Sequence, residues 1–161
     1  DLTKDSAKIV ALDIFPAKLD ELRKRCSRNK IESIQTLNVD DDELLNTIEL
    51  NADGVLIDAP CSGMGVLKRN PDSKWSMTPE RLTTLLKTQE SILQTYAPMV
   101  KKGGYLVYAT CSILPLENRL QIDQFLNSEV GSQFELEKEH TYFSHLTGFD
   151  GFYCARLIKK M

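Results

Sequence analysis

The sequence predicts an α/β fold built on a mostly parallel, doubly wound sheet that closes with an antiparallel hairpin. Short apolar runs typical of buried strands alternate along the chain with amphipathic segments of helical period. Three of these runs end at or near an aspartate, and two lead into a cysteine. The last two runs are joined only by a turn-rich segment, which favours antiparallel pairing.

The first elements follow from apolar periodicity and from proline. Residues 7–12 predict a short apolar strand that ends at Asp13. Pro16 then opens a helix that runs to about Asn29, because proline suits the first helical turn and leucines recur on one face. A weaker strand is expected over residues 34–37.

The middle of the chain carries the clearest strand, residues 52–58, after a short acidic helix expected over residues 41–49. An irregular loop should follow this strand through about Met77. Thr78 is a helix N-cap with proline behind it, and the helix should run to about Val100, where basic residues and two glycines end it.

The last third of the chain predicts a strand over residues 104–109 and a helix over residues 116–127. Residues 134–138 and 152–158 predict the closing pair of strands. The segment that connects them is rich in turn residues and has no helical pattern long enough for a parallel crossover. We therefore expect these two strands to form the antiparallel hairpin.

Composition places limits on the class of protein. A length of 161 residues suits one compact domain. The apolar fraction of 42% and the charged fraction of 27% are typical of a globular protein, and no run approaches the ~20 apolar residues of a membrane span. The net charge of −3 argues against a strongly basic nucleic-acid binder but leaves room for a local basic face. We therefore expect no membrane partner.

The chain has four cysteines and two histidines, and none of them has the spacing of a metal site. The scattered cysteines do not suggest a disulfide framework, so we expect free thiols, no metal ion and a reducing cytoplasmic location. Two thiols stand out. Cys61 lies in Asp-Ala-Pro-Cys-Ser-Gly and Cys111 in Ala-Thr-Cys-Ser, each just beyond a buried strand, where α/β proteins build their active sites. Such a pair, with a carboxylate nearby, points to covalent chemistry.

Asp13, Asp40 and Asp58 are each expected near the carboxyl end of a strand. In nucleotide-binding folds, an acidic residue that ends the second strand accepts hydrogen bonds from ribose hydroxyls, and Asp13 occupies that position. Asp40 could bind an adenine amino group, and Asp58 an ammonium group or a substrate base. No glycine-rich phosphate loop of the GxGxxG type stands between a strand and a helix in this chain.

Four stretches together resemble one enzyme family, the Sun/RsmB-type (Fmu) RNA cytosine-5 methyltransferases. They are ALDIFPAKLDELR, DAPCSGMGVLKRNPDSKW, KKGGYLVYATCSILPLENRLQIDQFL and GFDGFYCARLIKK. The resemblance covers almost the whole chain. It implies a class I, Rossmann-like fold that binds S-adenosylmethionine and an RNA substrate, most plausibly ribosomal RNA.

The chain departs from the family in one respect. The family's first strand and glycine-rich motif should lie just upstream of Asp1, with an RNA-binding domain before them, and neither is present in this sequence. We therefore expect residues 1–161 to be the C-terminal part of a catalytic methyltransferase domain. We also expect these residues alone to bind the cofactor poorly and to be inactive.

The resemblance implies separate roles for the two cysteines. Carbon 5 of cytosine is a poor nucleophile, and a thiolate that adds to carbon 6 makes it enamine-like and able to attack a sulfonium methyl group. Chemistry alone leaves open which sulfur attacks. The family pattern implies that Cys111 is the nucleophile and that Cys61 assists release of the methylated product.

Further roles follow from the same resemblance. Asp58 would bind the polar edge of the cytosine or the cofactor, with Pro60 shaping the pocket. Lys74 would stabilise the negative base adduct or contact phosphate, although a solvated loop lysine would look the same. We expect Trp75 to pack the loop rather than to stack on a base, and residues 68–69 to form a basic patch that faces RNA.

Other functions remain compatible with the sequence. The chain could belong to a class I methyltransferase acting on transfer RNA, on another non-ribosomal substrate, or on a small molecule or protein. It could also be a non-catalytic nucleotide- or RNA-binding fragment, which would leave both strand-end thiols unexplained. A trapped covalent RNA adduct at Cys111 would separate these hypotheses.

Overall fold

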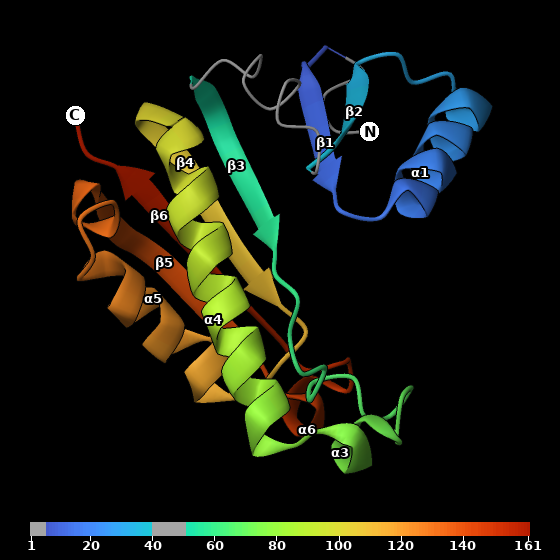
Figure 1. Cartoon of the computed structure of the whole chain (residues 1–161), viewed down its shortest axis with the longest axis vertical. Coiled ribbons are helices and arrows are strands. Elements are labelled where there is room, and N and C mark those ends of the chain that lie inside the picture. The colour runs from blue at the N-terminus through green and yellow to red at the C-terminus, as the bar shows by residue number, and fades with distance from the viewer. Residues whose placement is uncertain (1–5, 40–50) are drawn as a thin grey trace. The chain divides into compact units, whose positions relative to one another are not determined.

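The computed structural model describes residues 6–39 and 51–161 (Figure 1). The chain divides between Glu49 and Leu50 into two compact units, and each is described by itself. The acidic helix expected over residues 41–49 and the candidate ligand Asp40 lie outside the described residues. None of the described helices is both long enough and apolar enough to cross a bilayer.

The first unit contains a parallel β-α-β arrangement. Strand β1 (Ile9–Asp13) pairs in parallel with β2 (Ile34–Asn38), and helix α1 (Pro16–Asn29) connects them. The helix begins at the predicted proline and ends where Lys30 adopts a left-handed conformation, with φ of 54°. The predicted pattern is therefore confirmed here, with the strand boundaries moved by one or two residues.

The second unit is built on a four-stranded sheet with the order β3-β4-β6-β5. Strand β3 (Ala52–Asp58) runs parallel to β4 (Val100–Thr110), while β6 (Phe152–Lys159) is antiparallel to both β4 and β5 (Phe134–Tyr142). The closing antiparallel hairpin of β5 and β6 is confirmed, and β6 lies between β5 and the parallel pair β3-β4. Across the described strands the pairing is mixed rather than mostly parallel.

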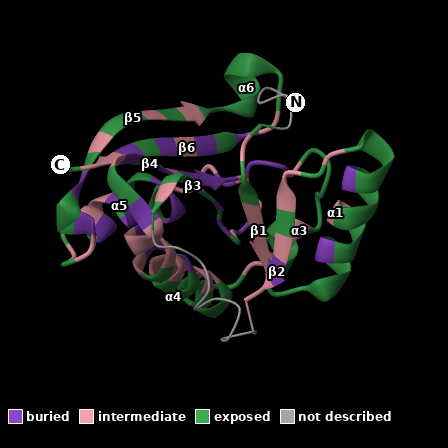
Figure 2. Ribbon diagram, turned by 90° about the horizontal axis from the view of Figure 1, so that it is seen from above, coloured by how far each residue is buried: buried purple, intermediate pink, exposed green. Residues whose placement is uncertain are grey.

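Helices α4 (Pro79–Tyr96) and α5 (Arg119–Leu126) cover the same side of this sheet, as Figure 2 shows from above. Their apolar faces bury large side chains against the strands. The fully buried members of this core include Leu93 and Ile122 from the helices and Leu106, Tyr108 and Leu157 from the sheet. Burial of this kind supplies most of the stabilisation of such a layer.

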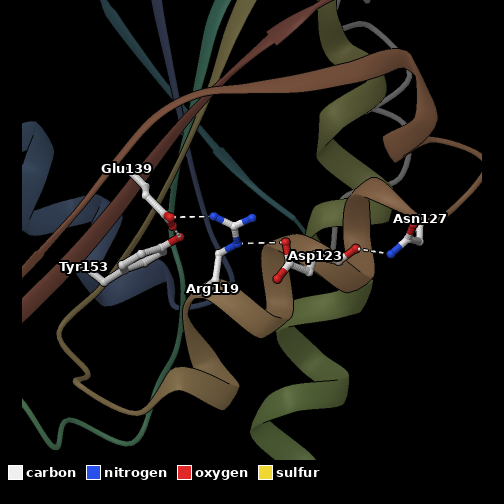
Figure 3. A network of polar contacts seen from close by, with 5 residues as sticks. All are labelled: Arg119, Asp123, Asn127, Glu139 and Tyr153. Carbon is white, nitrogen blue, oxygen red and sulfur yellow. Dashed lines mark hydrogen bonds and ion pairs between the residues drawn. The ribbon is translucent and has the colours of Figure 1, made fainter.

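A polar bridge attaches α5 to the hairpin at the edge of this core (Figure 3). The Arg119 guanidinium donates to Asp123 on its own helix at 2.8 Å and to Glu139 on β5 at 2.6 Å. The Tyr153 hydroxyl of β6 donates to the other oxygen of Glu139, also at 2.6 Å. Helix and hairpin are thus tied by the partly exposed Arg119, Asp123 and Glu139, with the buried Tyr153 behind them.

Helix α4 ends four residues before the predicted boundary at Val100. Pro98 cannot donate a backbone hydrogen bond, and the chain tightens into a 3-10 turn over Ala97–Met99 before β4 begins. The glycines expected to end the helix lie inside β4 instead, where Gly103 has φ of 72° and the register to β3 shifts. A glycine in that conformation marks a bulge.

The helix predicted over residues 116–127 is broken by Asn118. A 3-10 turn occupies Pro115–Glu117, and α5 starts only at Arg119. The Asn118 side chain is used in two tertiary hydrogen bonds described below. The loop after β3 is also less irregular than expected, since it contains the short helix α3 (Ser73–Ser76). Another short helix, α6 (Ser144–Thr147), lies between the hairpin strands.

We predict that Leu93→Ala destabilises the second unit by about 2–5 kcal/mol, because it removes a side chain that is 0% exposed in the centre of the core. Leu146→Ala is the matched control, since Leu146 is 74% exposed and should change stability by less than about 0.5 kcal/mol. Urea unfolding of both variants measures the difference. Equal effects of the two substitutions would contradict the described core.

Candidate functional site

The two candidate thiols meet at the carboxyl edge of the parallel pair. In the β3–β4 register Asp58 lies opposite Ala109, and the Ala59 amide donates to the Ala109 carbonyl at 2.9 Å. The strands therefore end side by side, and the residues that follow them remain adjacent. The Cys61 and Cys111 sulfur atoms lie 3.3 Å apart, both partly buried and both free.

This contact makes the two sulfurs chemically unequal. A hydrogen bond from Cys61 lowers the pKa of Cys111 to about 7, against the opposing effects of burial and of the Asp58 and Glu117 carboxylates. The same hydrogen bond, together with burial, raises the pKa of Cys61. Either sulfur could be the donor by geometry alone, and the opposite directions of the two pKa shifts favour Cys61 as the S–H donor. Cys111 is then the sulfur that forms the thiolate, which is the state that acts as a nucleophile.

A close contact between two glycines brings a third segment to the thiols. The Gly65 amide donates to the Cys111 carbonyl at 2.9 Å, and the Gly151 amide donates to the Gly65 carbonyl at 2.7 Å. A Cβ atom on Gly65 would lie 2.1 Å from the Gly151 carbonyl oxygen, so only glycine permits this approach. An ion pair of 2.7 Å between Arg69 and Asp150 supports the same contact.

A buried carboxyl group lies behind the Cys61 loop. Glu117 is 0% exposed, and its Oε1 atom accepts the Ser62 amide at 2.7 Å and Gln89 Nε2 at 3.1 Å. Its Oε2 atom accepts the Ser62 hydroxyl at 2.5 Å. Gln89 also donates to the Pro60 carbonyl at 2.8 Å, so the residues on both sides of Cys61 are bound.

A second buried group orders the Cys111 loop. The Asn118 amide donates to the Ser112 carbonyl at 3.0 Å, and its oxygen accepts the Thr110 hydroxyl at 2.6 Å. The Ser112 and Ser62 hydroxyls lie 3.2 Å apart and join the two loops.

Sequence reasoning assigned no role to the residues of this network. Two signals in the sequence could have found it: a serine directly after each cysteine, and the Glu-Asn pair that follows the second. The polar side chains that carry the network are Ser62, Gln89, Ser112, Glu117 and Asn118.

The remaining candidates of the second unit surround the thiols less closely. Asp58 and Pro60 are both exposed, and the Asp58 carboxylate accepts no hydrogen bond from the other described residues. Lys74 is exposed, with its ammonium 4.8 Å from the centre of the Trp75 ring. The expectation that Trp75 packs the loop is wrong, because its side chain is 79% exposed. It lies on the four-residue helix α3, which has no buried residue.

Of the expected basic patch, residues 68–69 are exposed, but Arg69 is already paired with Asp150. Among the described residues no group of histidine, cysteine and acidic side chains could hold a metal ion.

The strand-end acids offer the hydrogen-bond acceptors that ribose hydroxyls require, each within its own unit. Asp13 Oδ1 accepts the Phe15 amide at 2.9 Å at the start of α1, and Oδ2 lies 3.4 Å from the Lys18 ammonium. A carboxylate has lone pairs beyond these two contacts, so Asp13 can still accept from hydroxyl groups. Asp58 has both oxygens available as far as the described residues go. Each of these carboxylates, taken by itself, fits the hydroxyl or amino donors of a ligand.

A family model described as 16S rRNA methyltransferase RsmB/F matches residues 1–158 of the chain. Ribosomal RNA small subunit methyltransferase B of Yersinia pseudotuberculosis is 35% identical over 163 residues, which cover 96% of this chain and 37% of that protein. The protein of the same name from Yersinia pestis matches equally well. The chain therefore spans little more than a third of the length of the curated relatives it matches.

Solved structures agree with this similarity. The crystal structure of PH0851 is 30% identical with a TM-score of 0.88, over 98% of this chain and 38% of that chain. The structure of NSun6 from Pyrococcus horikoshii with SFG has a TM-score of 0.85 at 22% identity, over 99% of this chain and 43% of that one, and supports the fold alone.

We predict that iodoacetamide alkylates Cys111 with a pH midpoint near 7, read by peptide-resolved mass spectrometry, since the thiolate forms above its pKa. Cys61→Ala removes the hydrogen-bond donor and should move this midpoint about one to two pH units higher. Cys154→Ala is the control, because Cys154 lies on β6 and should leave the midpoint unchanged. An unchanged pH midpoint of Cys111 alkylation in Cys61→Ala would contradict the assignment of Cys61 as the donor.

Proposed function

The chain belongs to the 16S rRNA methyltransferase RsmB/F family. From this premise we propose that it uses its two thiols to catalyse the transfer of a methyl group to carbon 5 of a cytosine in RNA. One observation carries the proposal: two sulfurs 3.3 Å apart at a strand-end edge, of which one has a pKa lowered to about 7. S-adenosylmethionine is the cofactor of this family, and when bound it supplies the methyl group.

The reaction begins at Cys111. Its thiolate adds to carbon 6 of the cytosine, and the displaced electron pair moves to the base, where it makes carbon 5 nucleophilic. Carbon 5 takes the methyl group as the bond between the sulfonium sulfur and that methyl group breaks, and the electron pair stays on the departing sulfur as a neutral thioether. Carbon 5 then loses its proton to a base. The electrons of that C–H bond restore the ring double bond as the Cys111 sulfur leaves with its electron pair. The Cys111 thiolate is thereby regenerated and no oxidant or reductant is consumed.

Cys61 fits the later half of this sequence. In the free protein its S–H group is the hydrogen bond that favours the Cys111 thiolate. Once Cys111 is bonded to carbon 6 its sulfur no longer carries that negative charge. The largest cause of the raised Cys61 pKa is then removed, while burial still raises this pKa. We propose that Cys61 at this stage passes its proton to solvent and accepts the proton from carbon 5.

The other candidate residues complete the proposed site. Asp58 binds the amino edge of the cytosine or the cofactor, and Pro60 shapes the pocket. Lys74 is exposed and available to a phosphate or to the negative base adduct. A target base must be unstacked to reach such thiols. Asp13, and Asp40 in the part of the chain outside the described residues, are proposed as cofactor ligands.

We assign the substrate as ribosomal RNA, because the matching family model and the curated relatives are named for it. The protein would act in the cytoplasm, where reducing conditions keep both sulfurs as free thiols. We further propose that residues 1–161 form the C-terminal part of the catalytic domain, consistent with their share of the relatives' length.

We predict that Cys111→Ala in the full-length protein abolishes methyl transfer to RNA, because no thiolate remains to activate carbon 5. Cys61→Ala should instead accumulate a covalent protein–RNA complex, since elimination is blocked after methylation. Denaturing gels with radiolabelled RNA and S-adenosylmethionine measure both outcomes. Cys154→Ala serves as the control and should turn over normally.

Near-normal turnover by Cys111→Ala would exclude Cys111 as the nucleophile. A covalent complex that forms with Cys111→Ala but not with Cys61→Ala would exchange the two roles.

We predict that Asp13→Ala weakens binding of S-adenosylmethionine by the full-length protein roughly 10- to 150-fold, the equivalent of a charged hydrogen-bond acceptor worth about 1.5–3 kcal/mol. Asp13→Asn separates this role from the structural hydrogen bond in the turn before α1, because its amide oxygen can still accept the Phe15 amide. Calorimetry should show weakened binding in both variants, with loss of thermal stability only in Asp13→Ala. Unchanged affinity in both would leave Asp13 with the structural role alone.

A further inference from the structure

We propose that Glu117 is a positioning residue, which holds the Cys61 loop against Cys111 so that the two sulfurs stay within hydrogen-bond distance. The inference deepens the proposed function and rests on it for its catalytic meaning. Glu117 lies on the turn Pro115–Glu117, far along the chain from the loop it binds. It is fully buried, so it cannot contact the RNA or the cofactor itself.

The carboxyl group binds the residue directly after Cys61 at two points. Its two oxygens accept the Ser62 amide and the Ser62 hydroxyl separately, which fixes both the position and the orientation of that residue. Gln89 on α4 donates to the same carboxyl group and to the Pro60 carbonyl. Ser62 is therefore held directly by the carboxyl group and Pro60 is held through Gln89, with Cys61 between them.

The turn that carries Glu117 is itself held in place from the Cys111 strand. The Tyr108 hydroxyl, on β4, donates to the main-chain carbonyl of Glu117 at 2.8 Å. Asn118, the next residue, binds Thr110 and Ser112 on either side of Cys111. The same turn thus contacts the flanking residues of both cysteines, and the Ser62 and Ser112 hydroxyls meet between them.

This geometry gives Glu117 an effect on Cys111 opposite to that of its charge. Its negative charge, like that of Asp58, raises the pKa of Cys111, whereas the Cys61 hydrogen bond that it positions lowers this pKa. Loss of the carboxyl group should therefore raise the Cys111 pKa if Glu117 acts by position, and lower it if Glu117 acts only by charge. The sign of the change separates the two effects.

The test measures alkylation of Cys111 in the full-length protein without RNA or cofactor, against pH, by peptide-resolved mass spectrometry. Glu117→Leu removes both acceptors and should move the midpoint upward by more than one pH unit. For a rise of about 1.7 pH units the rate at pH 7 should fall about fourfold, because the thiolate fraction drops about 25-fold while the more basic thiolate is intrinsically more reactive. Glu117→Gln keeps one carbonyl acceptor for the Ser62 amide and should restore a midpoint close to that of the wild type.

Two further variants separate positioning from general destabilisation. Ile122→Ala removes a fully buried side chain of the same core without touching Ser62, so it should lower the melting temperature and leave the midpoint unchanged. Ser62→Ala removes only the hydroxyl contacts and should give an intermediate rise, which keeps the test decisive if Glu117→Leu does not fold.

A double-mutant cycle shows whether the effect passes through Cys61. In a Cys61→Ala background, Glu117→Leu should produce no further upward shift. A shift of the same size without Cys61, a downward shift in Glu117→Leu, or a wild-type midpoint in both Glu117→Leu and Ser62→Ala would each overturn the proposal. Because no methyl transfer is measured, a failed shift is distinct from a failure of the proposed function.

Discussion

The parallel pairing of β3 with β4 is the constraint on which the rest of the site depends. It ends both strands at one edge, with Asp58 opposite Ala109, so that the loops after them run side by side. Parallel strands require a long crossover, and here helix α4 provides it. That helix brings Gln89 under the Cys61 loop, so the connection that permits the pairing also contributes to the site.

The site combines an accessible edge with a rigid buried base. Exposed residues such as Asp58 and Lys74 can meet a ligand, whereas Ser62, Glu117 and Asn118 are buried and fully used in hydrogen bonds. Among the described residues no buried side-chain polar atom lacks a partner. A satisfied buried network favours one arrangement, because any slip leaves a polar group unpaired in a medium of low dielectric constant. The two sulfurs are therefore held by groups that take no part in the proposed reaction.

Local sequence rules predicted most of the elements and failed where tertiary contacts compete with them. The starts of α1 and α4 were predicted correctly because proline and threonine act within a single turn. The end of α4 was misplaced, since the glycines that resembled a helix stop belong to a bulge in β4. The helix after Pro115 was predicted as continuous, but Asn118 turns its side chain to Thr110 and Ser112 and interrupts it.

The sequence by itself determined which chemistry-bearing residues follow the strands, because strand ends and turn residues are properties of short segments. The two cysteines, the strand-end acids and the closing hairpin all followed from such patterns. Only the tertiary structure decided that β6 inserts between β4 and β5, that the Cys61 and Cys111 sulfurs lie in contact, and that Glu117 binds a serine 55 positions away. These features depend on contacts between segments distant in the chain, and no local periodicity records which distant partner a buried polar group will find.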